Sequence, residues 1–436
     1  MKLIKLDFSK LIFLSAFVII VPVFFILDGA SLKLAPSFSS QLTGNTIIPF
    51  SILAIPIIFL INLVYLKIKV SKLALLIFLI FLILPSMGYL FGVFIYENTT
   101  SKSLLRFIQT ILPMISFGLS IQFISNMHIK DKIGLMVRFY EIFQFILILV
   151  SCLYMFQTFL LIDFTNRFSL LADHIGPFYN PKVKRFFPAI IAGIVCYNMA
   201  LLFFSIWQHN KFKKKSFIVI IFCLGIVSAY WGRTAIVAII LTFLYLIWVT
   251  KSFRLISYVV GILVFISGTL FTLLYFTGIN LENTLSLLRL VDMLSANELS
   301  AGDKIRIERL IFAFSEMFKT PFGSAFSLHD NSGYLMMDIA IAENGFLDLG
   351  VRSGFLAPLL IAVIALTFIF KLNKYAIYTS SEKVFGLSAF LFSQIICVGF
   401  FLHIFTEPYY ATYIWFWFGA ICASITPLTK YLKMRS

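Results

Sequence analysis

Four arginines stand at positions from which they could bind a phosphate group: Arg185, Arg233, Arg306 and Arg309. A guanidinium group can pair with phosphate through two parallel hydrogen bonds, and it keeps its charge even when it is partly buried. Arginines at the mouth of a helix bundle would therefore hold a diphosphate at the level of the lipid headgroups. Each arginine alone could equally pair with a nearby carboxylate or with an anionic headgroup.

The elements that would position these arginines are membrane-spanning helices. Of the 436 residues, 61% are hydrophobic and 12% are charged, whereas soluble domains carry about 25% charged residues. The apolar residues form blocks long enough to cross about 30 Å of hydrocarbon. Backbone groups in lipid must be hydrogen-bonded within their own segment, so these blocks predict helices. We therefore expect an all-α integral membrane protein, with residues 1–436 forming a single polytopic domain.

The apolar blocks predict about twelve transmembrane helices. They cover residues 11–27, 46–66, 73–95, 104–126, 139–162, 189–207, 217–230, 234–249, 255–277, 354–370, 384–404 and 412–427. Lysine and arginine are concentrated in every second connection, as the positive-inside rule requires of cytoplasmic loops. This alternation predicts an inner-membrane protein with both termini in the cytoplasm. The first block is expected to be a retained span, because no small-residue cleavage site follows it.

The formal net charge of +16 is explained mainly by the predicted topology, because most basic residues lie in the predicted cytoplasmic loops. We therefore expect no nucleic-acid partner. The five cysteines all fall inside predicted spans and show no CxxC spacing. They are expected to be small buried apolar residues rather than disulfides or metal ligands. No metal and no other cofactor is expected.

Two predicted outer loops, residues 163–188 and 278–353, hold basic residues on the side that the positive-inside rule disfavours. The shorter loop contains Arg167 and Arg185, and the longer loop contains Arg306 and Arg309. Long exported loops tolerate charge, so this placement alone does not demand a function. Arg233 is different, because it lies in a tight turn between two predicted spans and has almost no loop around it.

The large outer loop has helical patterning of its own. Apolar residues recur at three- and four-residue spacing in 281–294 and 305–318, with charged residues on the opposite side. The sequence from Thr320 to Gly323 predicts the end of the second helix. Both helices should lie along the membrane surface or cap the bundle.

Several segments resemble the O-antigen polymerase and O-antigen ligase superfamily, which includes the Wzy-type polysaccharide polymerases. GPFYNPKVKRFF (176–187) resembles a family segment of the outer loop that precedes a span. SAYWGRTAIVAIIL (228–241) resembles a family turn in which an arginine leads into a span. Two further segments resemble the family signature of the large outer loop: RLIFAFSEMFKTPFGSAF (309–326) and ENGFLDLGVRSGFLAPLL (343–360).

The resemblance implies a metal-independent, C-type glycosyltransferase-like fold at the outer face of the bacterial inner membrane. Such an enzyme would join undecaprenyl-diphosphate-linked oligosaccharide repeat units into a surface polysaccharide of the O-antigen or capsule type. Arg233 and Arg309 would bind the diphosphate, with Arg306, Arg185 and Arg167 close by. The lipid bilayer is the other expected partner, and a chain-length regulator protein is left open.

The chain departs from the family pattern His-Asn-x-x-Leu, in which the resemblance implies that the His is the general base. At that register the chain has Glu343, followed by Asn344 and, three residues later, Leu347. Glu343 and His329 are both candidates, and a carboxylate is the weaker base of the two near neutral pH. Glu343 could instead start a helix or pair with Arg352. Asn344, Tyr334 and Asp348 are expected to contact sugar.

Other functions stay open. A ligase of the same superfamily would transfer finished glycan to the lipid A core. A flippase or transporter of lipid-linked oligosaccharide would place charged residues at mid-depth in its spans, and the predicted spans are nearly free of them. A structural scaffold would need no arginine cluster. The run YYATYIWFWF (409–418) predicts an aromatic belt at the membrane interface rather than a sugar-stacking platform.

Overall fold

The computed structural model describes the chain as a series of helices. The described residues are 31–32, 48–64, 72–95, 101–125, 132–160, 188–229, 233–251, 301–323, 344–402, 405 and 408–433. Within them, the regular structure is helical except for one antiparallel pair of two-residue strands, β1 (Ser31–Leu32) and β2 (Ile48–Pro49). The prediction of an all-α protein is confirmed for this part of the chain.

The helices coincide with the predicted spans wherever these fall on described residues. In the first part of the chain they are α3 (Phe50–Val64), α4 (Lys72–Ile95), α5 (Ser101–Ser125), α6 (Lys132–Leu160), α7 (Pro188–His209), α8 (Lys214–Ala229) and α9 (Arg233–Thr250). After residue 300 they are α13 (Ala301–Lys319), α14 (Gly345–Ser353), α15 (Leu356–Thr379), α16 (Glu382–Leu391), the π-helix η2 (Phe392–Val398), α17 (Gly399–Phe401) and α18 (Pro408–Lys433). The predicted spans 11–27 and 255–277 and the predicted helix 281–294 lie outside the described residues.

Among the described residues, four helices are long and apolar enough to cross a membrane. They are Lys72–Ile95, Ala189–His209, Leu356–Thr379 and Glu382–Phe401. Shorter apolar helices cover Ile55–Val64, Thr110–Ser125, Thr234–Thr250 and Ala411–Ser424. α4 also exposes large apolar side chains along its length, among them Leu76, Ile83 and Phe94. Exposed leucine and phenylalanine in such a continuous row suit a lipid environment rather than water, as expected of a membrane protein.

The helices group into two compact units, each built from separate stretches of the chain. Unit 1 comprises Met1–Arg138, Ala301–Ile364 and Gly399–Ser436, and unit 2 comprises Phe139–Ser300 and Ala365–Val398. Each unit is described by itself.

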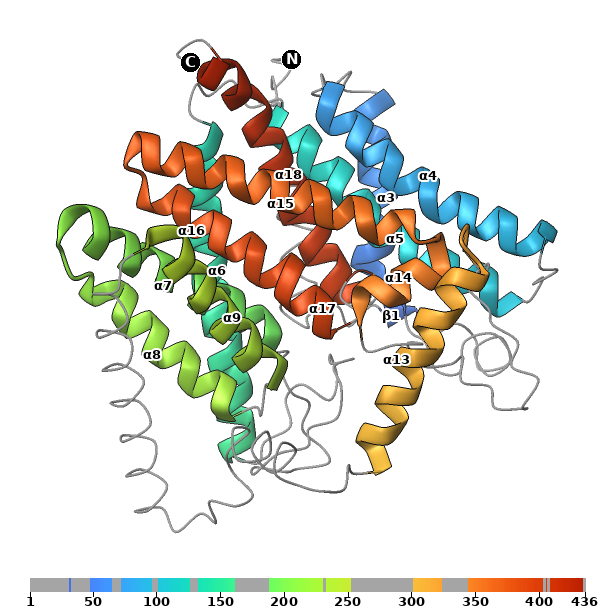
Figure 1. Cartoon of the computed structure of the whole chain (residues 1–436), viewed down its shortest axis with the longest axis horizontal. Coiled ribbons are helices and arrows are strands. Elements are labelled where there is room, and N and C mark those ends of the chain that lie inside the picture. The colour runs from blue at the N-terminus through green and yellow to red at the C-terminus, as the bar shows by residue number, and fades with distance from the viewer. Residues whose placement is uncertain are drawn as a thin grey trace, which may run out of the picture. The chain divides into compact units, whose positions relative to one another are not determined.

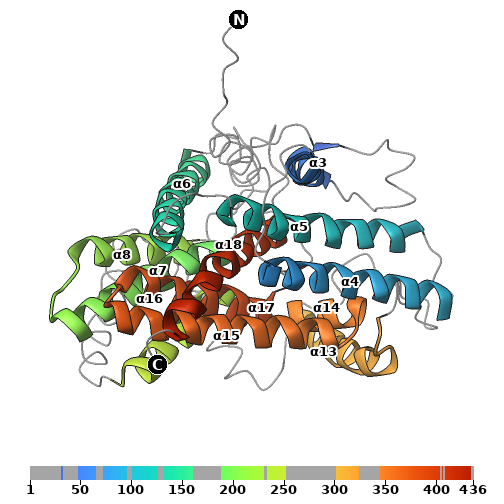
Figure 2. The same ribbon diagram turned by 90° about the horizontal axis from the view of Figure 1, so that it is seen from above.

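In unit 1, α5 packs along α18 and also contacts α3 and α4 (Figure 2). Gly419 permits the close approach of α18, because a Cβ there would lie 2.5 Å from the carbonyl oxygen of Phe117 on α5. Trp415 packs against Phe81 of α4, with the ring centroids 5.1 Å apart. These contacts make a continuous aromatic core across three helices.

The aromatic run of α18 is therefore part of the protein interior. Tyr413, Trp415 and Trp417 are at most 1% exposed. The predicted interface belt is wrong for residues 413–418, because α5 covers this face of α18 and its large side chains fill the helix–helix contact. Tryptophan and tyrosine occur both in membrane-interface belts and in protein cores, and only the tertiary packing distinguishes the two locations.

In unit 2, α7 is the central helix, with α8, α9 and α16 packed around it (Figure 1). Small residues allow α7 to approach both η2 and α16 closely. A Cβ at Gly193 would lie 2.9 Å from Nε2 of Gln394 on η2, and one at Gly386 would lie 2.8 Å from the ring of Tyr197. The amide of Gln394 donates to the carbonyl of Ala189 in the first turn of α7 (3.0 Å). The first turns of α7 are thus fixed to the π-helix.

A buried polar network ties α9 to the helices that follow α14. Asn373 of α15 donates to the hydroxyl of Tyr245 on α9, and Ser388 of α16 donates to the amide oxygen of Asn373 (2.5 Å). The ring of Tyr245 stacks on Phe392, with centroids 4.2 Å apart. Polar groups buried in an apolar interior are stable only when they are hydrogen-bonded. This network therefore fixes the register of α9 within unit 2.

Candidate functional site

The helix α13 carries two of the arginines that were predicted to bind diphosphate, Arg306 and Arg309. They are three residues apart and so lie on neighbouring positions of one helix face. The Nε of Arg309 is buried, and it has no hydrogen-bond partner among the described residues. Leaving a buried donor unpaired costs about 1–3 kcal/mol. An anion that reached this nitrogen would remove that cost.

Packing against α14 sets the orientation of Arg309. Ala313 and Val351 form a buried contact between α13 and α14, supported by Leu310 and Leu347. Arg309 precedes Ala313 by four residues, so it lies on the same face of α13, toward α14. Arg309 is thus partly buried and lies on the side of α13 that carries this contact.

The start of α14 is closed by one of the predicted sugar-binding residues. Asn344 is the N-cap, and its Oδ1 accepts a hydrogen bond from the backbone N–H of Leu347 (3.0 Å). The side chain is buried, at 5% exposure. The next residue is Gly345, and its lack of a side chain matters because a Cβ there would lie 2.6 Å from the carbonyl oxygen of Leu402. The amide oxygen of Asn344 is therefore occupied by capping, and its contact with sugar stays a prediction.

Asp348, the second of these residues, forms a buried ion pair. Its Oδ1 accepts from Nε of Arg352, one helical turn later, at 2.9 Å. The Asp348 side chain is fully buried and that of Arg352 is 8% exposed. Among the described residues, Arg352 thus pairs with Asp348, whereas Glu343 was the partner considered from the sequence. This pair positions α14, and a contact between Asp348 and sugar stays a prediction.

Glycines allow the end of α13 and the backbone of α14 to approach α4 closely. A Cβ at Gly88 of α4 would lie 2.5 Å from the carbonyl oxygen of Arg352, and a Cβ at Gly323 would lie at the same distance from that atom. Gly323 has φ 101° and Gly354 has φ 82°, both in the region that favours glycine. The predicted end of the helix at Thr320–Gly323 is confirmed, since α13 ends at Lys319. This glycine junction (Gly88, Gly323 and Gly354) brings the end of the arginine-bearing helix into close contact with α4, a helix long and apolar enough to cross a membrane.

Arg233 is the first residue of α9, and α8 ends at Ala229. The two helices are separated by residues 230–232, which lie outside the described residues, so the predicted tight turn between two spans stays a prediction. The first four N–H groups of a helix have no partner within it, and the helix dipole favours an anion there. Arg233 belongs to unit 2, whereas Arg306 and Arg309 belong to unit 1. That these arginines converge on one pocket stays a prediction.

The other predicted site residues lie outside the described part of the chain. They are Arg167, Arg185, His329, Tyr334 and Glu343. Their roles stay predictions. α7 begins at Pro188, close to the position that the sequence predicted for the span after the shorter outer loop. Among the described residues, no group of three or more His, Cys, Asp or Glu side chains is arranged to hold a metal ion.

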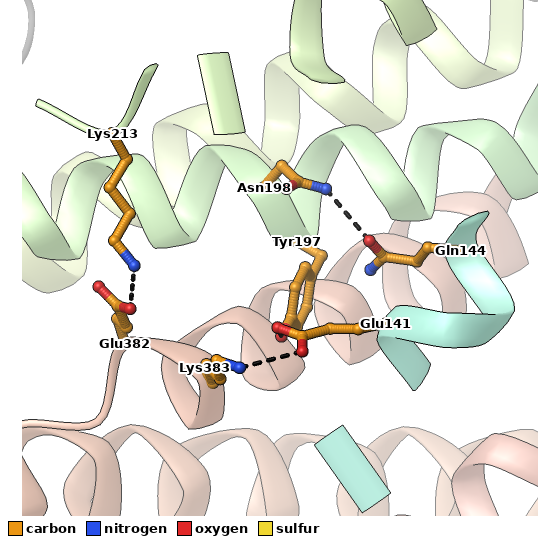
Figure 3. Close-up of polar contacts among 7 residues, drawn as sticks. All are labelled: Glu141, Gln144, Tyr197, Asn198, Lys213, Glu382 and Lys383. Atoms are coloured by element: carbon orange, nitrogen blue, oxygen red, sulfur yellow. Dashed lines mark hydrogen bonds and ion pairs between the residues drawn. The ribbon is translucent and has the colours of Figure 1, made fainter. Parts of the chain in front are cut away.

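A second polar cluster, which was not expected from the sequence, lies in unit 2 (Figure 3). Lys383 pairs with Glu141 of α6 (3.0 Å), and Glu382 pairs with Lys213 from the connection between α7 and α8. The hydroxyl of Tyr197 donates to Glu141 at 3.4 Å. Two consecutive residues at the start of α16 thus bind two different elements. Each of these charges has an opposite partner, so the cluster joins α6 and the α7–α8 connection to the start of α16 and reads as structural.

A neighbouring contact continues this cluster along α7. The amide of Asn198 donates to Oε1 of Gln144 on α6 (3.2 Å) and to the carbonyl of Ile194 (2.9 Å). The sequence signal that could have revealed the cluster is the presence of Glu141 and Glu382 beside basic stretches. Glu141 falls inside the predicted span 139–162 and Glu382 just before the predicted span 384–404, and nothing in either local pattern shows that the two regions meet.

No model of a known protein family matches the sequence, and no curated protein matches it. The chemistry of the arginine-bearing helix and its junction with α4 is therefore the basis for a functional conclusion.

Proposed function

We propose that this protein is a polysaccharide polymerase of the O-antigen polymerase and ligase superfamily. It would join undecaprenyl-diphosphate-linked repeat units at the outer face of the bacterial inner membrane. The observation that best supports this proposal is Arg309, whose buried Nε has no hydrogen-bond partner among the described residues. A partly buried cation fixed beside a membrane span suits a lipid-linked anion.

In the proposed reaction, a hydroxyl oxygen of the acceptor sugar forms a bond with the anomeric carbon of the donor glycan. The bond between that carbon and the diphosphate oxygen breaks, and undecaprenyl diphosphate leaves with the electron pair. The hydroxyl proton passes to a base, either Glu343 or His329. Arg309, with Arg306 and Arg233, stabilises the charge that develops on the leaving diphosphate. Fixed donors of this kind contribute about 3–4 kcal/mol each to lowering the barrier.

The proposal includes about twelve spans with both termini in the cytoplasm. The second polar cluster supports this orientation, because it joins three segments that the sequence assigns to one side of the membrane. These segments contain Glu141 near the start of the predicted span 139–162, Lys213 between α7 and α8, and Glu382 with Lys383 at the start of α16.

A direct assay of bond formation tests the function. Purified protein in detergent, supplied with synthetic lipid-linked repeat units and a metal chelator, should produce a ladder of longer glycans. If product forms only when lipid A core is the acceptor, the protein is the ligase instead. If no new glycosidic bond forms but labelled lipid-linked oligosaccharide crosses the bilayer of reconstituted vesicles, it is a flippase.

A further inference from the structure

The helix α13 has two apolar faces. One face packs on α14 through Leu310 and Ala313. The other consists of Ile307, Ile311, Phe314 and Phe318, which are between 41% and 65% exposed. These four residues, called here the α13 stripe, recur at three- and four-residue spacing and therefore form a single row along the helix.

Polar residues border the α13 stripe. Glu308, Ser315 and Lys319 are all exposed, and each lies about one helical position to the side of the row. Lys319 pairs with Glu316 at 2.6 Å. A row of large apolar side chains beside charged ones is the pattern of a helix that rests at the boundary between lipid and water. It is not the pattern of a helix surrounded by lipid on all sides.

The stripe points to lipid because it continues a lipid-facing surface of α4. Phe322, in the turn that follows α13, stacks on Phe91 of α4 with ring centroids 4.9 Å apart. Phe91 shares a helix face with Phe94 and Ile95, which are both exposed. α4 is one of the four helices suited to cross a membrane. The apolar surface of that span thus leads directly to α13.

The direction of α13 fits this placement. It crosses the direction of α4 at a steep angle, since α4 is long in both views while α13 is extended in Figure 1 and foreshortened in Figure 2. Both helices belong to unit 1. If α4 crosses the bilayer, α13 lies near the membrane plane at the end of α4 that contains Ile95.

We propose that α13 is an interfacial helix, whose stripe inserts into the bilayer leaflet at the Ile95 end of α4. The occupant of this face is lipid, at the boundary between headgroups and acyl chains. The inference requires only that α4 crosses a membrane, so it holds whether or not the protein is a polymerase. Arg309 lies on the other side of α13, so the same helix that contacts lipid would carry the guanidinium group at headgroup level.

Photocrosslinking in native-like membranes tests the proposal without removing the native cysteines. A benzophenone-bearing phenylalanine analogue replaces Phe318 in one variant and Ser315 in the matched control, and the protein is reconstituted in phosphatidylglycerol and phosphatidylethanolamine vesicles. We expect lipid adducts at position 318 to exceed those at position 315 several-fold by mass spectrometry. The analogue at Phe94 of α4 gives the reference for a lipid-facing position.

Other outcomes would overturn the proposal. Equal and low lipid adducts at positions 318 and 315, with a strong signal at 94, would mean that the stripe faces water. A crosslink from position 318 to protein would mean that another part of the chain or a second copy covers the stripe. A nitroxide at Ile311→Cys supplies an independent measurement, because a lipid position is accessible to oxygen and a water position to a nickel chelate.

Discussion

The guanidinium of Arg352 reaches back one helical turn to the carboxylate of Asp348, with Nε and Oδ1 2.9 Å apart and both side chains buried. This pair lies within a helix of nine residues, between the cap at Asn344 and the glycine junction with α4. A helix this short is marginal by itself, so its order depends on the contacts at its two ends and on the pair between them. The pair thus helps to fix the surface against which α13 positions Arg309.

Breaking this pair should destabilise the protein. Asp348→Ala leaves the charge of Arg352 buried without its carboxylate, which costs about 3–5 kcal/mol. We expect a clearly lower midpoint of thermal unfolding in detergent. Lys319→Ala is the matched control, because it breaks an exposed i,i+3 pair on α13, and such pairs contribute only about 0–1 kcal/mol. Equal Tm values for the two variants would contradict a structural role for the Asp348–Arg352 pair.

Arg309 should be needed for activity and not for stability. Its buried Nε has no partner among the described residues, so Arg309→Met removes an unsatisfied donor and should leave the unfolding midpoint unchanged or raise it. Glycan ladder formation should fall by about two to three orders of magnitude, the effect of losing one fixed donor to a developing negative charge. Arg309→Lys should retain part of the activity, because lysine keeps the positive charge but cannot form the two parallel hydrogen bonds of a guanidinium group.

The control for this prediction is again Lys319→Ala, which removes a basic residue from the exposed side of the same helix. It should leave the ladder unchanged. An Arg309→Met protein that makes a normal ladder would exclude Arg309 from diphosphate binding. A protein that fails to fold would show instead that the arginine is structural.

The glycine junction should not tolerate a methyl group. Gly88→Ala would place Cβ 2.5 Å from the carbonyl oxygen of Arg352, so the backbone of α14 would have to move. Such overpacking costs about 1–3 kcal/mol. Gly225→Ala on α8 is the control, because a Cβ there meets nothing within 4 Å. The first variant should lower Tm and the second should raise it slightly, since alanine favours helix more than glycine does. A neutral Gly88→Ala would contradict the close contact.

The proposed topology predicts where introduced cysteines react. Asn210→Cys lies in the connection that contains Lys213 of the second polar cluster, and Ser380→Cys lies in the connection directly before Glu382 of that cluster. Both should be protected from a membrane-impermeant maleimide added to intact spheroplasts and should react after lysis. Arg233→Cys, at the start of α9, should react before lysis. The reverse pattern would invert the predicted orientation of unit 2.

The helix positions could be predicted from the sequence because the length of an apolar block is a direct consequence of membrane thickness. The block 73–95 corresponds to α4 at Lys72–Ile95, and the Thr320–Gly323 turn ends α13. The turn was predictable because proline and glycine act locally on the backbone.

Tertiary contacts could not be predicted in the same way. The spacing of Asp348 and Arg352 allowed an i,i+4 pair, but Glu343 was the partner of Arg352 that was considered from the sequence. The aromatic run of α18 was equally ambiguous, because Gly419 had to be matched with Phe117 of α5 before a buried contact could be inferred. The meeting of Glu141 with Lys383 joins residues 242 positions apart, and local patterns carry no information on such pairs.

The π-helix η2 has a consequence for how this span can be altered. A π-turn contains one residue more than an α-turn, so deleting a single residue between Phe392 and Val398 should allow a continuous α-helix to form. Side chains beyond the deletion would keep close to their present orientation, because the π-turn closes over one residue more than the α-turn for about the same rotation. Gly399, where a Cβ would lie 3.0 Å from the ring of Phe405, would therefore still face that ring. The surplus residue is thus an insertion that the wide turn absorbs without changing how the residues after it pack.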